Sequence, residues 1–292
     1  MSAQTDSLNT TADPAAARAG VIGLGMIGGG VAVSLARSGR VPTVYDIRPD
    51  AADKLAGVPA PVGSPAEVAR ASDVVLVAVV DADQARTVLF ADDGVLAGAR
   101  PGLIVVLLST VAVPVVHELA ETCAKAGVSL LDSGVTPGDK AAENGLVAIL
   151  GGEDSTVERA LPVLDDFAKR VVHCGPLGAG MATKIARNVI TYGTWRAVYE
   201  ATTLAGAAGV DPRKLITVIE EADPEGATLF SWQRQQLAGT ARALMNQVGR
   251  LQDKDLAAAQ ELAGQLGLTL PLTDVTRAHG AETLAAESGK DA

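Results

Sequence analysis

The clearest chemical signal in this chain is a set of glycines spaced GxGxxG between an apolar run and an amphipathic one. Gly23 permits a tight turn, Gly25 lets the backbone approach a pyrophosphate, and Gly28 lets a helix pack against a strand. The start of a helix adds unpaired N–H groups and a positive dipole end, which favour an anion. The spacing predicts a dinucleotide site at Gly23, Leu24, Gly25, Met26, Ile27 and Gly28.

Asp46 follows the glycines by about 20 residues, where a carboxylate accepts hydrogen bonds from the adenosine ribose. Because a carboxylate at this position repels the 2′-phosphate of NADP, Asp46 predicts NAD. Arg48 could meet that phosphate instead, which leaves NADP possible. A glycine-rich turn that binds nothing is the alternative to a nucleotide site.

A second candidate lies on a later helix, in the segment Gly178–Asn188. Lys184 and Asn188 are one turn apart on one face, and Thr191 and Trp195 return to that face. Lysine is rarely buried without a partner or a task. An ammonium group in a cleft could give a proton to a substrate oxygen or take one from it. A solvated lysine on a helix between domains is the alternative.

The elements that must position these residues change in kind along the chain. Strands are expected over 19–23, 42–46, 73–80, 103–108, 128–132, 146–150 and 170–173, with helices over 26–38 and from capping boxes at Ser64 and Ser155. Later segments are all helical: 178–208, 211–221, 227–237, 247–266 and from 271 onward.

Strand–helix alternation followed by helices alone predicts two domains. The first is an α/β Rossmann domain with a doubly wound, mostly parallel sheet, and the second is an all-α domain joined to it by a long interdomain helix. We expect a disordered tail over 1–17, an NAD-binding domain over 18–177 and a helical domain over 178–292.

Composition excludes several classes of protein. With 48% apolar and 20% charged residues, the chain is globular. A formal net charge of −10 argues against a nucleic acid or an anionic membrane as partner. No apolar run reaches the ~18 residues of a membrane span. The two cysteines and three histidines are scattered, so we expect no metal site, no disulfide and a reducing cytoplasm.

From Ala19 to about Pro271 the sequence resembles the β-hydroxyacid dehydrogenase family, which includes 3-hydroxyisobutyrate dehydrogenase and tartronate semialdehyde reductase. The glycine fingerprint is the less specific motif, whereas the complete GxGxxxKxxxN segment is characteristic. The resemblance implies a nucleotide-binding domain like that of 6-phosphogluconate dehydrogenase. It makes Lys184 the catalytic lysine and Asn188 the asparagine that contacts the substrate.

Further residues receive roles from the same resemblance. Thr110, in the pair Ser109-Thr110, is expected to contact the nicotinamide half of the cofactor. Lys254, which opens a Lys-Asp-Leu motif, is expected near the cofactor, and Val79 is placed in the cofactor set as well. A homodimer or homotetramer is implied by analogy.

The substrate segment departs from the family pattern. The family usually reads Asp-Ala-Pro-Val-Ser-Gly-Gly, where this chain has Asp-Ser-Gly-Val-Thr-Pro-Gly over 132–138. Thr136 keeps the hydroxyl and Gly138 keeps one permissive backbone position, but Pro137 removes an N–H donor for the substrate carboxylate. We therefore expect a substrate with a bulkier or more apolar substituent, held by Trp195, unless Trp195 is plain core. Phe230 and Trp232 carry the same ambiguity.

The residues predict an NAD-dependent oxidoreductase that interconverts a β-hydroxyacid and its semialdehyde or ketone. Decarboxylating 6-phosphogluconate dehydrogenases carry Glu two turns beyond the lysine, where this chain has Thr191, so no decarboxylation is expected. Two alternatives stay open. One is an NADPH-dependent imine or semialdehyde reductase, although imine reductases usually replace the lysine by Asp or Tyr. The other is a non-catalytic dinucleotide-binding or interaction protein.

Overall fold

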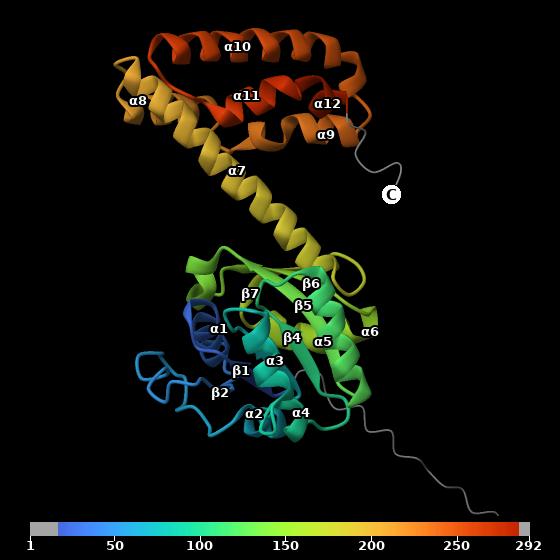
Figure 1. The fold of residues 1–292 in the computed structure, drawn as a ribbon. Helices are drawn as coiled ribbons and strands as arrows, with labels where there is room; N and C mark the ends of the chain where they lie inside the picture. Colours follow the sequence, from blue (N-terminus) through green and yellow to red (C-terminus); the bar gives the residue numbers. More distant parts are fainter. Residues whose placement is uncertain (1–16, 286–292) are drawn as a thin grey trace, which may run out of the picture. The chain divides into compact units, whose positions relative to one another are not determined.

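The computed structural model describes residues 17–285 and divides after Asn188 into two compact units, which we describe separately (Figure 1). Unit 1 ends at Asn188 and unit 2 begins at Val189. The disordered tail expected over 1–17 lies outside the described residues except for Ala17.

Unit 1 is built on one seven-stranded sheet, in the order β2-β1-β3-β4-β5-β6-β7. All neighbouring strands are parallel except β5 and β6, which are antiparallel. The mostly parallel, doubly wound sheet is confirmed. The strands are β1 (Ala19–Ile22), β2 (Thr43–Tyr45), β3 (Val74–Val77), β4 (Ile104–Leu107), β5 (Ser129–Thr136), β6 (Leu146–Gly151) and β7 (Ala168–His173).

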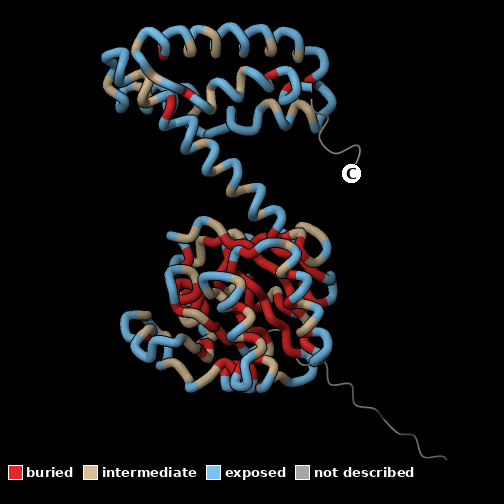
Figure 2. Tube along the Cα trace, viewed as in Figure 1, coloured by how far each residue is buried: buried red, intermediate tan, exposed pale blue. Residues whose placement is uncertain are grey.

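Helices cover both faces of this sheet, as a sheet buried on both sides requires. Every residue of β3 and β4 is buried, and Figure 2 shows the central strands as the buried part of unit 1. The apolar cluster on one face includes residues of α1 (Met26–Arg37) and α6 (Asp154–Leu164). The opposite cluster includes residues of α2 (Pro65–Ala71), α3 (Ala82–Phe90), α4 (Val95–Gly98) and α5 (Val113–Lys125).

Two local expectations have different outcomes. The hydroxyl of Ser64 accepts a hydrogen bond from the N–H of Glu67 at 3.3 Å, so the first predicted helix cap is confirmed. The cap predicted at Ser155 is wrong, because α6 begins at Asp154 and its N-cap Glu153 makes no side-chain bond. Ser155 lies inside the first turn, where its hydroxyl cannot act as the N-cap.

Strand β5 is longer than the apolar run that predicted it. The run ends at Asp132, but pairing with β6 continues from Asp132–Gly151 to Thr136–Val147. Backbone pairing with a neighbour thus carries the strand through Gly134, a residue type that is depleted in strands. The substrate segment identified in the sequence is therefore largely strand. It is followed by the 3₁₀ helix η2 (Gly138–Glu143).

Unit 2 is helical, as expected, and few of its described residues are buried (Figure 2). Helix α7 (Ala179–Ala207) begins in unit 1 and ends in unit 2. The other helices are α8 (Pro212–Ala222), η3 (Ala227–Phe230), α9 (Ser231–Leu237), η4 (Ala241–Ala243), α10 (Met245–Gln265), α11 (Pro271–Ala278) and α12 (Gly280–Ala285). Within residues 17–285, no helix has the length and apolar composition that a membrane crossing needs.

We predict that Ser133→Ala will stabilise the protein. Ser133 lies in the central part of β5, is fully buried, and its hydroxyl has no hydrogen-bond partner among the described residues. An unpaired buried hydroxyl costs about 1–3 kcal/mol, and alanine removes it with little change in volume. Urea unfolding of the variant should give a free energy of unfolding higher by about 1 kcal/mol. A lower value would show that the hydroxyl is satisfied in solution.

Candidate functional site

The glycine turn between β1 and α1 has the geometry of an anion cradle. Gly23 has a φ of +87°, and a Cβ there would stand 2.5 Å from the carbonyl oxygen of Ala78. A Cβ on Gly28 would collide with the carbonyl of Gly23, whereas one on Gly25 would meet nothing within 4 Å. No side chain caps the start of α1. Open backbone and uncapped N–H groups fit a dinucleotide pyrophosphate.

Asp46 and Arg48 lie together at this turn. Asp46 accepts hydrogen bonds from the N–H of Leu24 at 2.7 Å and from the N–H of Arg48 at 2.9 Å, and its side chain is 8% exposed. The guanidinium of Arg48 lies 3.1 Å from the same carboxylate. Burial raises the pKa of Asp46, but the hydrogen bonds from Arg48 and Leu24 outweigh burial and lower it. The carboxylate stays charged beside the position expected for the ribose.

The ends of β3 and β4 meet beside the turn. The hydroxyl of Ser109 donates to the carbonyl oxygen of Val79 at 2.7 Å. A Cβ on Gly23 would stand 3.3 Å from a methyl carbon of Val79, so Val79 borders the glycine turn. Thr110 follows Ser109 and is exposed. The predicted residues Val79 and Thr110 thus lie at the carboxyl ends of the strands, where open α/β sheets bind ligands.

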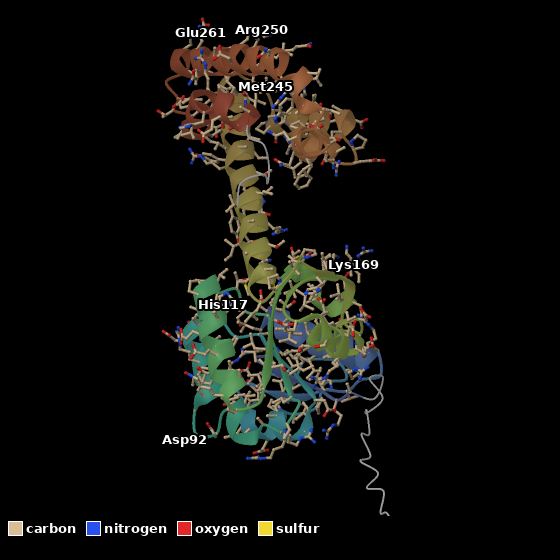
Figure 3. The ribbon with its side chains drawn as sticks, turned by 90° about the vertical axis from the view of Figure 1, so that its right-hand side faces the viewer. Asp92, His117, Lys169, Met245, Arg250 and Glu261 are labelled. Carbon is tan, nitrogen blue, oxygen red and sulfur yellow. The ribbon has the colours of Figure 1, made fainter. Side chains whose placement is uncertain are left out.

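Helix α7 is anchored to β5 by a buried carboxylate. Asp132 is fully buried and accepts hydrogen bonds from the N–H of Gly178 at 2.6 Å and of Met181 at 2.5 Å. A Cβ on Gly180 would stand 2.5 Å from the carbonyl oxygen of Ile149, so only glycine permits this approach. His117 of α5 lies against the same helix start, with its ring 3.1 Å from the Cβ position of Gly178 (Figure 3).

This anchor places Lys184 on the strand. The ammonium group donates to the carbonyl oxygen of Val135 at 2.7 Å. Its aliphatic chain lies over Gly134, where a Cβ would collide with the Cβ of Lys184 and stand 2.6 Å from its Cγ. Burial, and secondarily the charge of Arg187, lower the pKa of Lys184. A lysine with a lowered pKa exchanges protons more readily near neutral pH.

The segment that ends β5 and opens η2 lies against the glycine turn. A Cβ on Gly138 would stand 3.0 Å from the Cδ1 of Ile27 and 3.3 Å from the Cε of Met26. Thr136, which ends β5, adjoins the Val135 carbonyl that holds Lys184. Unit 1 therefore brings the glycine turn, Gly138 and the lysine to one edge of the sheet.

A second set of contacts ties η2 to helix α1. The hydroxyl of Ser34 donates to the carbonyl oxygen of Ala141 at 2.7 Å and accepts from the N–H of Asn144 at 3.1 Å. The side chain of Asn144 also bonds to Arg37. A Cβ on Gly30 would stand 2.5 Å from that of Ala141, so the two elements are in close contact. The segment after Thr136 is therefore held by the helix that follows the glycine turn.

Two predicted site residues, Trp195 and Lys254, belong to unit 2. The Trp195 side chain is 65% exposed and packs edge-on against Tyr192 at 5.2 Å, so the alternative of a plain core tryptophan is wrong. Lys254 pairs with Asp255 at 3.1 Å. The other aromatic residues differ from each other: Phe230 is 40% exposed, whereas the indole nitrogen of Trp232 is buried.

Three contributors were not found from the sequence. The sequence presents Asp132 and Gly134 only as members of a motif and assigns no role to Arg187. The signals were present: a lone acid at a strand end, a glycine where the family has proline, and a cation three residues after Lys184. None of them is informative until β5 and α7 are in contact.

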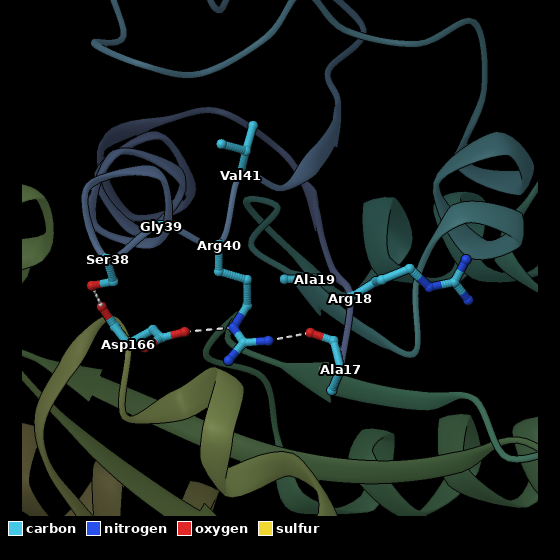
Figure 4. Close-up of a pocket in the computed structure, with 8 residues that line it drawn as sticks. All are labelled: Ala17, Arg18, Ala19, Ser38, Gly39, Arg40, Val41 and Asp166. Carbon is cyan, nitrogen blue, oxygen red and sulfur yellow. Dashed lines mark hydrogen bonds and ion pairs between the residues drawn. The ribbon is translucent and has the colours of Figure 1, made fainter. Parts of the chain in front are cut away.

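A separate surface hollow lies at the opposite edge of the sheet (Figure 4). Its lining includes Ala19 at the start of β1, and Ser38 and Arg40 beyond the end of α1. Arg40 pairs with Asp166, and the hydroxyl of Ser38 donates to the backbone carbonyl of Asp166. Both arginines of this hollow are held in ion pairs, Arg40 with Asp166 and Arg18 with Asp73. In the described residues no cluster of side chains could hold a metal ion.

Known families and relatives match almost the whole chain. Residues 18–175 match the family described as the NAD binding domain of 6-phosphogluconate dehydrogenase. Residues 178–292 match the family described as NAD-binding of NADP-dependent 3-hydroxyisobutyrate dehydrogenase. An uncharacterized oxidoreductase of Mycobacterium tuberculosis is 33% identical over 273 residues, 91% of this chain and 92% of the relative. A probable 3-hydroxyisobutyrate dehydrogenase of that species is 32% identical over 271 residues, covering 86% and 87%.

Solved structures share the fold. The M. tuberculosis 3-hydroxyisobutyrate dehydrogenase solved with L-serine has a TM-score of 0.66 at 28% identity, covering 93% of this chain and 95% of that one. An imine reductase variant from Myxococcus stipitatus, in complex with NAD+, has a TM-score of 0.75 at 19% identity, covering 94% and 96%. The second likeness shows the fold alone.

We predict that Gly134→Ala will displace Lys184 from Val135. The added methyl collides with the lysine stem, and such overpacking costs about 1–3 kcal/mol. Because burial is the main cause of the lowered pKa, displacement toward solvent will raise the pKa of Lys184. An NMR titration of ¹³C-labelled lysine, with the Lys184 signal identified by its loss in Lys184→Ala, measures this change.

Gly193→Ala is the matched control for this titration. Gly193 lies on the same helix, and a Cβ there meets nothing within 4 Å. Its substitution should leave the Lys184 signal in place. A Gly134→Ala variant that folds and keeps the wild-type titration would contradict the contact between Gly134 and Lys184.

Proposed function

Because the chain belongs to the β-hydroxyacid dehydrogenase family, and so is an NAD(P)-dependent oxidoreductase acting on a CH–OH group, we propose that it is a 3-hydroxyisobutyrate dehydrogenase-like enzyme. It interconverts a β-hydroxyacid and the corresponding semialdehyde or ketone, without decarboxylation and without a metal ion. The observation that carries the proposal is Lys184, half-buried, with a lowered pKa and hydrogen-bonded to Val135 of β5. The same strand leads to Gly138, which contacts Met26 and Ile27 of the glycine turn.

Lys184 is the proposed general acid and base. In oxidation its neutral amine takes the hydroxyl proton of the substrate, and in reduction its ammonium returns one. Since Val135 accepts one N–H of this amine, the lone pair is left for the substrate oxygen. NAD, when bound, would supply the acceptor for the hydride of the carbinol carbon. Asn188, the last residue of unit 1, orients the substrate in this proposal.

The cofactor would be held mainly by unit 1. We assign its pyrophosphate to the turn Gly23–Gly28, its ribose to Asp46, and its nicotinamide half to Val79 and Thr110. We also assign Lys254 of unit 2 to the cofactor. The hydrogen bonds that keep Asp46 charged support NAD over NADP, with Arg48 the residue that could reverse the preference. We place the boundary between the cofactor-binding and helical domains at residues 177 and 178.

Substrate residues are assigned on both sides of the lysine. Thr136 and Gly138 would bind the acid end, and Trp195 would favour a substituent bulkier or more apolar than that of 3-hydroxyisobutyrate. Thr191 occupies the position of the decarboxylating acid, which supports a reaction that stops at oxidation. The alternative of an imine reductase rests on likeness of fold.

We also propose that the enzyme is a homodimer or homotetramer that works in the reducing cytoplasm. Large apolar side chains of unit 2 are exposed, at 65% for Trp195, 60% for Tyr199 and 69% for Leu237, and a second copy could cover them. Both cysteines are free, and Cys123 is buried.

The test of this function is NADH formation with a panel of β-hydroxyacids, in wild type and Lys184→Ala. Loss of a general acid–base group should lower kcat by roughly 10²–10⁴-fold while NADH affinity stays unchanged. Because the pKa of Lys184 is lowered, kcat/KM for oxidation should rise with pH and level off below the ordinary lysine value of about 10.4. In the reverse direction, activity should fall through the same pH.

Thr183→Ala is a control on the exposed side of the same turn, and it should keep wild-type kcat. An effect of Lys184→Ala confined to KM would make Lys184 a binding residue and remove it from the chemistry. No turnover with any hydroxyacid would overturn the proposed activity.

Cofactor choice is tested separately at Asp46. We predict that Asp46→Ala will weaken NAD and improve relative use of NADP, because it removes both the ribose acceptor and the charge that repels a 2′-phosphate. The ratio of kcat/KM for the two cofactors measures the change. Wild-type protein that already uses NADP as well as NAD would show that Arg48 overrides the carboxylate.

A further inference from the structure

Contacts between β5 and α7 advance along both elements in the direction of Thr136 and Arg187. Asp132 contacts the start of α7, and Gly134, two residues further along β5, contacts Lys184. Two further strand residues advance about 6.6 Å, and three or four helix residues advance about 4.5–6 Å. Continued by one turn of the helix, this register places Thr136, the last residue of β5, level with Arg187 and Asn188.

Burial along α7 agrees with this register. Residues 182, 183, 185 and 186 are exposed, whereas Met181 is buried and Lys184, Arg187 and Asn188 are half-buried. The face toward β5 is thus the one that carries Arg187. Its guanidinium lies 3.3 Å from the Oδ1 of Asn188, the residue assigned to orient the substrate. Burial is the main cause of the lowered pKa of Lys184, and the charge of Arg187 adds to it.

The substrate segment itself offers little to a carboxylate. Pro137 has no N–H to donate, which leaves the Thr136 hydroxyl and the backbone of Gly138 as the donors assigned to the acid end. Lys140, the cation of η2, is exposed and paired with Glu143 at 3.1 Å. A β-hydroxyacid needs charge-assisted donors at its acid end, and one guanidinium can supply two in parallel.

We propose that Arg187 binds the carboxylate of the substrate together with Thr136, and so replaces the donor that Pro137 removes. The inference rests on the proposed function, because it assumes a hydroxyacid whose hydroxyl faces Lys184. Arg187 is then a specificity-determining residue, which selects acids over the matching esters, amides and uncharged alcohols. In this arrangement Lys184 contacts the hydroxyl oxygen that reacts, and Arg187 contacts the carboxylate, which does not react.

The experiment compares an acid with its methyl ester in wild type, Arg187→Met and Arg187→Lys. The acid is the best β-hydroxyacid of the panel, with 3-hydroxyisobutyrate and its methyl ester as the reference pair. We expect Arg187→Met to raise KM for the acid roughly 10- to 100-fold, the range of a lost charge-assisted contact, and to leave KM for the ester within about threefold. Arg187→Lys keeps a positive charge but lacks the planar, two-pronged guanidinium. Its KM for the acid should therefore lie between those of wild type and Arg187→Met.

Arg70→Met is the matched control, since it removes an exposed arginine of unit 1 at the last turn of α2. It should leave both KM values unchanged and so exclude an effect of net charge. Equal changes for acid and ester, or no change for the acid in a folded Arg187→Met or Arg187→Lys, would overturn the proposal. Thermal unfolding of each variant confirms that it is folded.

A binding measurement separates failure of this inference from failure of the proposed function. Isobutyrate, which lacks the hydroxyl and cannot turn over, is titrated into the complex of enzyme and NADH while cofactor fluorescence is followed. If the panel shows no turnover, the proposed function fails. Weaker isobutyrate binding by Arg187→Met than by wild type would still support Arg187 as the residue that binds the carboxylate. Equal isobutyrate binding by wild type and Arg187→Met overturns the proposed role of Arg187, whether or not the enzyme turns over acids.

Discussion

The buried carboxylate of Asp132 is the contact on which the candidate site depends. An unpaired carboxylate in the interior would cost several kcal/mol, but here two N–H groups at the start of α7 bind its oxygens. The positive end of a helix dipole adds to this stabilisation. Asp132 is 46 residues from Gly178 and 49 residues from Met181 in the chain. Its hydrogen bonds to them therefore fix where α7 starts relative to β5. The position of Lys184 follows from that start.

Two glycines, Gly180 and Gly134, also determine where α7 and Lys184 lie. Gly180 lets the start of α7 approach the backbone of β6, and Gly134 leaves a gap in the face of β5 that the stem of Lys184 fills. Interiors are close-packed, so one methyl group in either place would shift the helix or expel the lysine. The proline that the family pattern has at position 134 would carry side-chain atoms there. The placement of Lys184 on Val135 is thus tied to a departure from that pattern.

Helix α1 connects the segment proposed to bind the cofactor with the segment proposed to bind the substrate. Its first turn faces the position of the cofactor pyrophosphate, and its middle holds η2 through Ser34, which bonds to both Ala141 and Asn144. Gly30 allows the two elements to touch. A displacement of α1 would therefore move the cofactor turn and the segment after Thr136 together.

Local patterns in the sequence determined the elements, their order and the residues able to do chemistry. Apolar runs predicted the seven strands, the glycine spacing predicted the turn before α1, and the motif around Lys184 identified the lysine. These signals are readable because each depends on residues within one turn or one strand. Where a neighbouring strand decides, the prediction failed, because β5 extends to Thr136 by pairing with β6. The cap predicted at Ser155 failed for a local reason, because α6 begins at Asp154.

Tertiary structure alone decided what surrounds the lysine. The contacts of Asp132 with Gly178, of Lys184 with Val135, and of Ser34 with Asn144 join residues 46 to 110 positions apart. No periodicity or motif encodes such pairs, because they arise only when the sheet, α1 and α7 pack against one another. The sequence determined that a lysine with the right neighbours exists. The packing of α7 on β5 decided that this lysine is half-buried, hydrogen-bonded to a strand carbonyl, and lowered in pKa by burial and the charge of Arg187.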